Sequence, residues 1–278
     1  MMRLCIVGFG LIGGSIAAAL RARGHAVHLT AIDGRAVLET PRAAELADAL
    51  VDAGDDPGRR SALSSADLVV LAVPVRRIEV LLPEALELGR AVTDCGSTKR
   101  ALMRAAAALP RGRRFVGGHP MAGAPQGGVH NARADLFEGR GWILCPEASD
   151  AECVEKVRGL LQAVGAREIC MSAEQHDRAV AVTSHVPQLL ASALCVQASA
   201  AKATVAAGPA YAGATRVAGG PADMWRDIFA TNGDEVARAL GELCGELQGV
   251  AGALAGGDPE RALGLLERAR RERAGERE

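Results

Sequence analysis

Short apolar runs alternate with longer mixed stretches over the first 170 residues of the chain. The apolar runs have the length and composition of buried strands, and the mixed stretches carry apolar residues at helical spacing. The predicted strands are Arg3–Val7, Ala26–Ile32, Ala66–Pro74, Ala91–Asp94, Phe115–Gly117, Trp142–Cys145 and Arg167–Cys170. The predicted helices are Ile12–Arg23, a stretch beginning near Pro41, a stretch after Pro74, one from about Lys99, and Ala151–Val164. This alternation implies a mostly parallel sheet covered on both faces.

From about Ser172 the strand pattern gives way to alanine-rich helical sequence. An apolar stripe follows Asn232 at alternating spacings of four and three residues: Val236, Leu240, Leu243, Leu247, Val250 and Leu254. Such a stripe lies on one face of a helix, either as ordinary core or as the seam of a dimer. We therefore expect two domains, an α/β domain over residues 1–171 and an all-helical domain over residues 172–278.

Composition and charge exclude several classes of protein. Hydrophobic residues make up 49% of the chain, enough for an ordinary core, and 32 basic against 33 acidic residues leave a net charge of −1. This balance carries no electrostatic signature of a nucleic-acid or membrane-lipid partner. The apolar run from about Val186 to Ala207 is interrupted by Gln188, Gln197 and Lys202, so we expect a buried helix rather than a membrane span.

The seven cysteines are scattered and form no CxxC pair. This pattern favours reduced thiols in the cytoplasm over a disulfide framework or a zinc site. The amino-terminal MMRLCIVGFG has the form of a strand running into a glycine turn, which is too short for a signal peptide. We expect a cytoplasmic protein without a bound metal.

The first chemical motif is VGFGLIGGS at residues 7–15. A GxGxxG pattern alone is weak, but here it follows a strand and opens an amphipathic helix, which is the context of a Rossmann-type dinucleotide fingerprint. Gly8 would permit the tight turn, Gly10 the approach of the pyrophosphate, and Gly13 close packing of the helix on the strand. The N–H groups of the helix N-terminus would face the phosphates.

Asp33 ends the second predicted strand, where a carboxylate can accept hydrogen bonds from both adenosine ribose hydroxyls. It would repel a 2′-phosphate, which favours NAD over NADP. Arg35 leaves the alternative open, since an arginine at this place sometimes pairs with that phosphate. The expected cofactor contacts are Gly8, Gly10, Leu11, Ile12, Gly13, Asp33, Val73 and Pro74.

Two further segments follow the ends of predicted strands. Ser97, in TDCGSTK, can touch the reacting end of a cofactor or, with Thr98, simply cap the next helix; taken alone, the cap is favoured. His119, in FVGGHPMAG, directly follows a short strand in a stiff loop, where its imidazole could act as a general base. A lone loop histidine is by itself more often structural.

The helical half carries its own candidates. His176 stands in EQHD and His185 in TSHVPQ, nine residues apart, which matches no metal-ligand spacing. Arg216 precedes Trp225 in DMWRDI by nine residues and could clamp a carboxylate, although a surface ion pair is the commoner role of an arginine.

Taken in order, these segments resemble the prephenate/arogenate (cyclohexadienyl) dehydrogenase family. The matching stretches are GFGLIGGS, DCGSTK, GGHPMAG with LFEGRGWILCP, EQHDRAVAVTSHVPQLLASAL, and Arg216 with DMWRDIFATN. They span Gly8 to Asn232. The resemblance implies a Rossmann-type domain followed by an all-helical domain that forms a homodimer, and an NAD-dependent oxidoreductase of tyrosine biosynthesis.

The resemblance also implies the roles of the residues. NAD would take a hydride from the ring carbon that bears the hydroxyl, and the ring carboxylate would leave as CO2. His119 would accept the hydroxyl proton, with Ser97 bonded to that hydroxyl or to His119. Arg216 would bind a substrate carboxylate. The other expected substrate contacts are His176, His185, Gln188 and Trp225.

Two departures from the family pattern fall where the substrate side chain would be sensed. Many members carry a second histidine where this chain has Gln188, and many prephenate-using members carry an acidic residue where this chain has the neutral run 124–128. The neutral run resembles arogenate-using members.

Three alternatives remain. The first is a dehydrogenase of an amino-substituted prephenate in specialised metabolism. The second is a β-hydroxyacid or imine reductase of the same layout, whose catalytic lysine would have to be Lys202, the only lysine of the helical half. The third is an NAD-binding redox sensor without catalysis, which would not need Ser97, His119 and Arg216 together.

Overall fold

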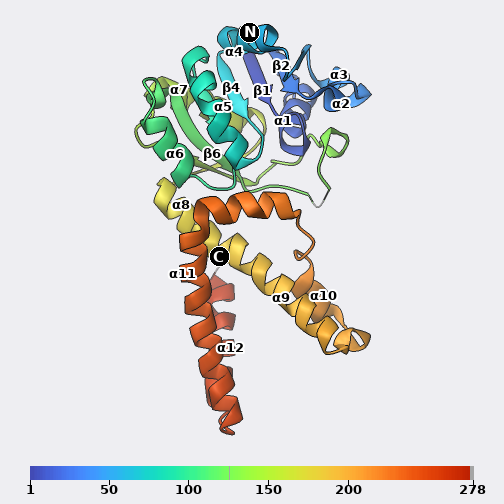
Figure 1. The fold of residues 1–278 in the computed structure, drawn as a ribbon, viewed down its shortest axis with the longest axis vertical. Helices are drawn as coiled ribbons and strands as arrows, with labels where there is room; N and C mark the ends of the chain where they lie inside the picture. The colour runs from blue at the N-terminus through green and yellow to red at the C-terminus, as the bar shows by residue number, and fades with distance from the viewer. Residues whose placement is uncertain (125, 276–278) are drawn as a thin grey trace.

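The computed structural model of the chain describes residues 1–124 and 126–275. Figure 1 shows an α/β part, β1 to β8, from which the helices α8 to α12 project on one side. Pro125, within the neutral run 124–128, and residues 276–278 lie outside the described residues.

One eight-stranded sheet forms the centre of the α/β part. Its order is β3-β2-β1-β4-β5-β6-β7-β8, and the strands are parallel except that β7 runs antiparallel to β6. The strands are β1 Met2–Val7, β2 Val27–Asp33, β3 Ala49–Asp52, β4 Leu68–Leu71, β5 Val92–Asp94, β6 Phe115–Pro120, β7 Gly141–Cys145 and β8 Arg167–Cys170. The predicted mostly parallel sheet is confirmed.

The strand β3 was not predicted. The sequence indicated a helical stretch from near Pro41, but the helix α3 ends at Leu46 and the next residues form a strand at the edge of the sheet. The strand β3 is short and its Leu50 is 37% exposed, so it lacks the buried apolar run by which the other strands were identified.

Helices cover both faces of the sheet, as expected. They are α1 Leu11–Ala22, α2 Arg35–Leu38, α3 Pro41–Leu46, α4 Asp56–Ser65, α5 Val75–Leu88, α6 Arg100–Ala107 and α7 Ala151–Ala163. Alternate residues of a strand join opposite cores: Leu4 of β1 packs with α1 and α7, and Cys5 packs with α4 and α5. The period of two in the strands therefore accounts for two buried layers.

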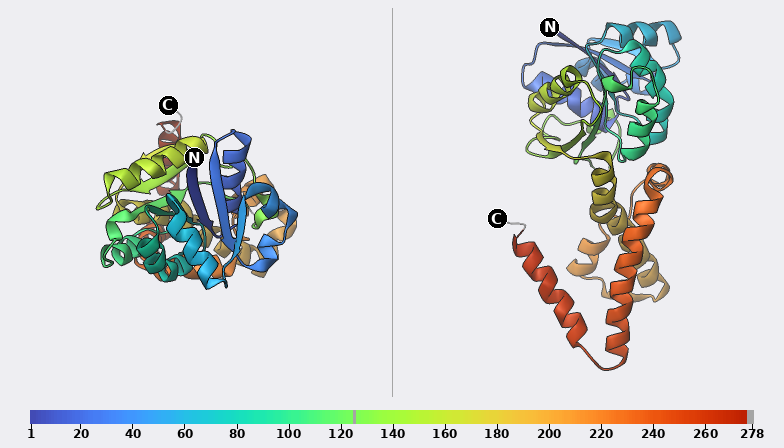
Figure 2. Two further views of the ribbon diagram at one scale, coloured as in Figure 1. Left: turned by 90° about the horizontal axis from the view of Figure 1, so that it is seen from above. Right: turned by 90° about the vertical axis from the view of Figure 1, so that its left-hand side faces the viewer.

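The helical part consists of α8 Ala173–Val180, a π-helical turn Ala181–His185, α9 Val186–Ala200, α10 Pro209–Thr215, α11 Ala222–Ala255 and α12 Glu260–Gly275. Figure 1 shows α9 with α10 diverging from α11 below the sheet, and the right view of Figure 2 shows α12 turning away from α11. The small core between them contains Ala181, Val186, Val236 and Ala239.

The prediction that the apolar run beginning at Val186 forms a buried helix is wrong for the single chain. Only Val186, Gln188 and Ala191 of α9 are buried, because α9 leaves α11 after its first turns. The continuous helix Ala173–Ala200 is long and apolar enough to cross a membrane by length and composition, with 33% of its most apolar window buried.

Part of the apolar stripe on α11 belongs to the core of the chain, and part is exposed as a possible dimer contact. Val236 is buried in the helical core, whereas Leu247 and Leu254, farther along, are 44% and 52% exposed. A substantial apolar surface of α9 and α11 is thus left uncovered in one chain, as expected of an interaction surface.

A buried ion pair fixes β5 against β6. The ammonium of Lys99 contacts the carboxylate of Asp94 and donates to the carbonyl of Gly118 at 2.7 Å, and both charged side chains are fully buried. Asp94 also accepts from the backbone N–H groups of Gly96 and Gly118, at 2.8 and 2.9 Å. The loop after β5 and the strand that carries His119 are therefore tied together.

Replacing Lys99 with Met should lower the free energy of unfolding by about 3–5 kcal/mol, because the Asp94 carboxylate would stay buried without its counter-charge. Denaturant unfolding of the variant measures this loss. The double variant Lys99→Met/Asp94→Asn leaves no isolated charge and should recover part of it. A single variant as stable as the wild type would contradict this account of the pair.

Candidate active site

The glycine turn between β1 and α1 has the geometry that the sequence motif requires. Gly8 has φ +94°, and a Cβ there would lie 2.5 Å from the carbonyl oxygen of Ala72. A Cβ on Gly13 would lie 2.1 Å from the carbonyl oxygen of Gly8, so only glycine lets α1 approach the turn this closely. Gly10, the N-cap of α1, has open space beside it, and no side chain caps the helix.

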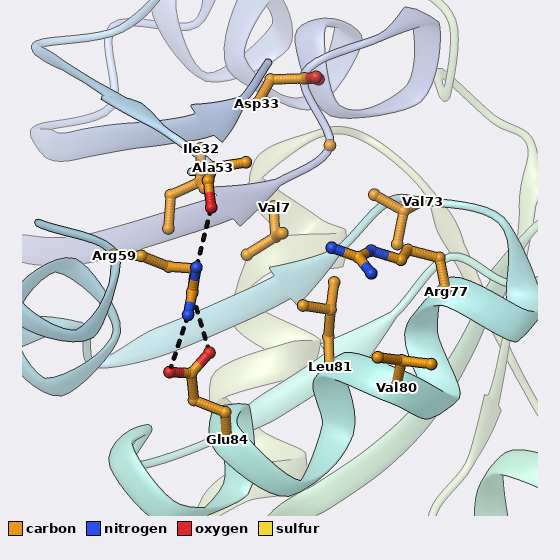
Figure 3. Close-up of a pocket in the computed structure, with 11 residues that line it drawn as sticks. Val7, Ile32, Asp33, Ala53, Arg59, Val73, Arg77, Val80, Leu81 and Glu84 are labelled. Atoms are coloured by element: carbon orange, nitrogen blue, oxygen red, sulfur yellow. Dashed lines mark hydrogen bonds and ion pairs between the residues drawn. The ribbon is translucent and has the colours of Figure 1, made fainter. Parts of the chain in front are cut away.

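A cavity of about 350 Å³ lies beside this turn (Figure 3). Its lining includes Val7 and Gly8 of the turn, Ile32 and Asp33 of β2, and Val73. The Asp33 carboxylate accepts hydrogen bonds from the backbone N–H groups of Phe9, at 2.6 Å, and Gly34, at 2.7 Å. The acid at the strand end thus also fastens the glycine turn.

Arginines around this cavity have different roles. Arg35, which does not line the cavity, donates to Asp52 at 2.7 Å in an exposed ion pair. Figure 3 shows Arg59 bonded to the carbonyl of Ala53 and to Glu84. Arg77, from α5, also lines the cavity, although no sequence motif marks this residue.

A second cavity, of about 260 Å³, opens between the α/β part and α11. Residues that are expected to contact the cofactor line this cavity together with Ser97, which is expected to contact the reacting groups, and with three side chains of α11. Its lining is Ile12, Ala72, Val73, Pro74, Val75, Cys95, Gly96, Ser97, Met224, Asp227 and Ile228. Leu11 does not line it and packs, half-buried, against the core.

The expectation that Ser97 or Thr98 caps α6 is wrong. The N-cap residue is Lys99, without a side-chain cap, and the Thr98 hydroxyl instead bonds Thr231 of α11 at 2.8 Å. The N–H groups of Lys99 and Arg100 donate to the carboxylate of Asp177 in α8, at 2.7 and 3.0 Å. A carboxylate from the helical part therefore caps this helix and leaves the hydroxyl of Ser97 at the cavity.

His119 lies within β6 rather than after it. The strand continues through Pro120 because β7 pairs with it, with His119 opposite Ile143. A Cβ on Gly118 would lie 2.6 Å from the carbonyl oxygen of Asp94, so glycine allows β6 to pass close to β5 at this point. The histidine is thus held by a sheet strand, which is more rigid than the predicted loop.

Side chains from α8 line up behind His119. The Nδ1 atom of His119 is 2.8 Å from Nε2 of His176, and Nδ1 of His176 is 2.7 Å from the Asp177 carboxylate. His176 and Asp177 are fully buried. The prediction that His176 lines the substrate pocket is therefore corrected: it supports His119 from behind.

Burial sets the charge of these groups. It lowers the pKa of His119 well below the usual 6.5, and neighbouring His176, Lys99 and His185 act in the same direction. Burial also lowers the pKa of His176, against the raising effect of Asp177. For Asp177, burial alone would raise the pKa, but hydrogen bonds from His176 and the backbone of Lys99 and Arg100 outweigh it, and the pKa is lowered. Both histidines are therefore neutral near pH 7, and Asp177 is ionised.

His185 ends the π-helical turn and is almost fully buried. Its ring meets that of Trp225 edge-on, with centroids 5.9 Å apart. Asn232, at a non-helical position inside α11, donates to the carbonyl of Asp177 at 2.8 Å and lies 3.4 Å from Nδ1 of His185. The structure thus brings His185, Trp225 and the His119 group into one neighbourhood.

Among the residues that the structure describes, neither Gln188 nor Arg216 is hydrogen-bonded to this group. Gln188 is 7% exposed and its amide lies 3.4 Å from the hydroxyl of Ser192 on the same helix. Arg216 follows α10, is exposed, and makes no hydrogen bond or ion pair with any other residue that the structure describes. Their contacts with a substrate stay predictions.

Several residues of the site were not identified from the sequence. Asp177, Arg100 and Asn232 form a junction between the two parts: Arg100 reaches Asp177, Asn232 and Asp234. Asp177 and Asn232 occur inside the EQHD and ATN segments, so charged and amide residues next to candidate histidines were the available signal. Within residues 1–124 and 126–275, no cluster of His, Cys, Asp or Glu has the arrangement of a metal site.

Comparison with known proteins gives matches along most of the chain. A family model described as "Prephenate dehydrogenase, nucleotide-binding domain" matches residues 16–170, and one described as "Prephenate dehydrogenase, dimerization domain" matches residues 172–268. A prephenate dehydrogenase of Bacillus subtilis is 34% identical over 88% of this chain and 68% of its own length. A cyclohexadienyl dehydrogenase of Zymomonas mobilis is 30% identical over 94% of this chain and 91% of its own length.

Solved structures agree in fold. Prephenate dehydrogenase from A. aeolicus, in complex with hydroxyphenyl propionate and NAD+, has a TM-score of 0.86 and 28% identity over 99% of this chain and 98% of its own. Synechocystis arogenate dehydrogenase has a TM-score of 0.82 and 28% identity over 99% of both chains.

Because buried histidines resist protonation in the folded chain, we expect the free energy of unfolding to decrease in mild acid. Burial lowers the pKa of His185 to about 4, so between pH 6.5 and 4 the unfolded chain binds a proton there that the folded chain does not. The free energy of unfolding should fall with pH in this window, by up to about 1.4 kcal/mol per pH unit for this group. Denaturant unfolding at pH 7, 6 and 5 measures the slope.

His185→Gln should flatten this slope, and His25→Gln, at an exposed position, should leave it unchanged. Equal slopes in the wild type and the His185 variant would contradict the assignment.

Proposed function

The chain belongs to the prephenate dehydrogenase family, and we propose that it catalyses the NAD-dependent oxidative decarboxylation of prephenate or arogenate. The observation that carries the proposal is a neutral, half-buried His119 on β6, next to β5, whose following loop carries Ser97 into a cavity that Ile12 of α1 also lines. Such a reaction belongs to tyrosine biosynthesis.

The residues of the first cavity fit NAD. Gly8 and Gly13 allow the tight turn and the close approach of α1, Gly10 leaves open space where the pyrophosphate would pass, and Asp33 offers a carboxylate at the ribose end. Gly8, Gly10, Leu11, Ile12, Gly13, Asp33, Val73 and Pro74 would hold the cofactor. NAD, when bound, supplies the hydride acceptor; the chain supplies binding, orientation and proton transfer.

His119 would act as the general base. As the hydride leaves the ring carbon, the hydroxyl on that carbon loses its proton to His119 and becomes a carbonyl. The ring carboxylate then leaves as CO2, and its bonding electrons make the ring aromatic. The oxygen becomes a phenolate, to which His119 returns the proton. Ser97, at the cavity, would orient the hydroxyl or the imidazole.

Substrate binding falls to the helical part. Arg216 would pair with a substrate carboxylate, since it has no counter-ion among the described residues. His185, with its Nδ1 facing the Asn232 amide, would offer its other ring nitrogen as a donor, and Trp225 would pack against the substrate ring. Lys202 is exposed beyond the end of α9, which does not suit the catalytic lysine of a reductase.

We also propose that residues 1–171 form the NAD-binding domain, that residues 172–278 form the dimerisation domain, and that two chains associate through the exposed apolar faces of α9 and α11. Leu194, Leu247 and Leu254 lie on these faces. Light scattering after gel filtration should give twice the mass of one chain. A monomer at micromolar concentration would overturn the dimer.

The activity is tested by following NADH absorbance with purified protein, NAD and either prephenate or arogenate. Turnover of at least one is expected, and the neutral run 124–128 favours arogenate. His119→Ala should lower kcat by about 10²–10⁴-fold, because the proton would have no acceptor.

NAD binding, measured by calorimetry, should be unchanged in His119→Ala, which separates catalysis from cofactor binding. Full activity in this variant would refute the role of His119. No turnover of either substrate by the wild type would favour an amino-substituted analogue.

A further inference from the structure

The two residues behind His119 form an unbroken chain of short contacts that ends on a charge. It runs from His119 Nδ1 to His176 Nε2 at 2.8 Å, and from His176 Nδ1 to Asp177 Oδ1 at 2.7 Å. His119 is on β6 and the other two are on α8. Each contact needs one donor and one acceptor, so the protonation of the last member determines that of the others.

Asp177 acts only as an acceptor. Its oxygens receive the backbone N–H groups of Lys99 and Arg100, at 2.7 and 3.0 Å, and the Arg100 Nε–H at 3.3 Å. A protonated carboxyl group would need an acceptor nearby, whereas each of these neighbours is a donor. The carboxylate is therefore ionised, and Nδ1 of His176 must carry the proton that faces it.

His176 then has one nitrogen left. A neutral imidazole with a proton on Nδ1 has a lone pair on Nε2. Full burial and the nearby Lys99 ammonium disfavour a second proton on this ring, in line with its lowered pKa. Its Nε2 therefore accepts, and the group 2.8 Å away, Nδ1 of His119, donates. His119 is left with a lone pair on Nε2, which bonds no other described residue.

We propose that His176 and Asp177 are positioning residues that hold His119 as the Nδ1–H tautomer, so that its Nε2 is the atom that takes the substrate proton. The transfer of a substrate proton to Nε2 rests on the proposed function, whereas the assignment of the His119 tautomer does not depend on it. In the step itself the substrate O–H bond breaks, an N–H bond forms on Nε2, and the electron pair of the O–H bond forms the carbonyl. The resulting imidazolium is stabilised by Asp177 through His176.

The competing arrangement is a doubly protonated His176 between Asp177 and His119. It would donate at both nitrogens, and His119 would then accept at Nδ1 and carry its proton on Nε2. That tautomer has no lone pair free for the substrate. The two arrangements thus differ in which ring nitrogen of His119 carries the proton, and this difference can be observed directly.

Nitrogen-15 NMR of the full chain with labelled histidine distinguishes them. The chain has six histidines, and His119→Gln, His176→Gln and His25→Gln assign the relevant signals. At pH 7 we expect His119 with a protonated Nδ1 and an unprotonated Nε2, and His176 in the same neutral form. A His119 signal with protonated Nε2, or an imidazolium signal for His176, would overturn the proposal.

A kinetic test follows the same logic. In His176→Phe the proton on His119 loses its acceptor, and the Nε2–H form becomes populated. We expect kcat to fall on the order of 100-fold with little change in KM or in NAD binding. His176→Gln, whose amide oxygen can accept from His119, should recover part of the loss, and His25→Gln should have no effect.

The outcomes separate this proposal from the proposed function. The expected tautomer without turnover of prephenate or arogenate would refute only the function. Turnover that depends on His119, with the reversed tautomer or with an unaltered kcat in His176→Phe, would refute only the positioning role. Equal loss in His176→Phe and His176→Gln, with unfolding at lower denaturant in both, would assign His176 a structural role and overturn the proposal.

Discussion

The buried carboxylate of Asp177 is the point on which the site depends. It caps the N-terminus of α6, pairs with Arg100 and holds His176 behind His119. A charge without water is tolerated only when it is fully hydrogen-bonded, and here backbone and side-chain donors from both parts of the chain supply those bonds. The same contacts that make burial of the charge possible therefore join the helical part to the sheet.

This junction explains how a site composed of distant segments is held in place. Arg100, at the start of α6, reaches Asp177 on α8 and both Asn232 and Asp234 on α11. At the same end of α6, the Lys99–Asp94 pair ties the loop after β5 to β6. The cofactor cavity, Ser97 and His119 are in this way positioned relative to the histidines of the helical part, although α9 and α11 diverge beyond it (Figure 1).

The features that could be predicted from the sequence are those that local residue patterns determine. The buried strands, the glycine turn and the acid at the end of β2 follow from short-range rules, and the structure has them at or within a few residues of the predicted positions. Long-range contacts were beyond those rules. The hydroxyls of Ser97 and Thr98 were expected to cap α6, but a carboxylate 78 residues away replaces them. The pairing of β7 with β6 likewise placed His119 within a strand, and the edge strand β3 lacked an apolar run.

The helical part shows the same limit at a larger scale. The apolar content of α9 predicted burial, yet most of α9 is exposed in one chain, because its apolar face has no partner within that chain. Sequence periodicity identifies an apolar face but not what covers it.

The role of His119 is tested most directly by a structure of the chain with NAD and a substrate analogue that keeps the ring hydroxyl. We expect the hydroxyl oxygen about 2.6–3.2 Å from Nε2 of His119, with His176 still between His119 and Asp177. A hydroxyl bound by His185 instead, or a His119 turned away from His176 to meet the substrate with Nδ1, would contradict it.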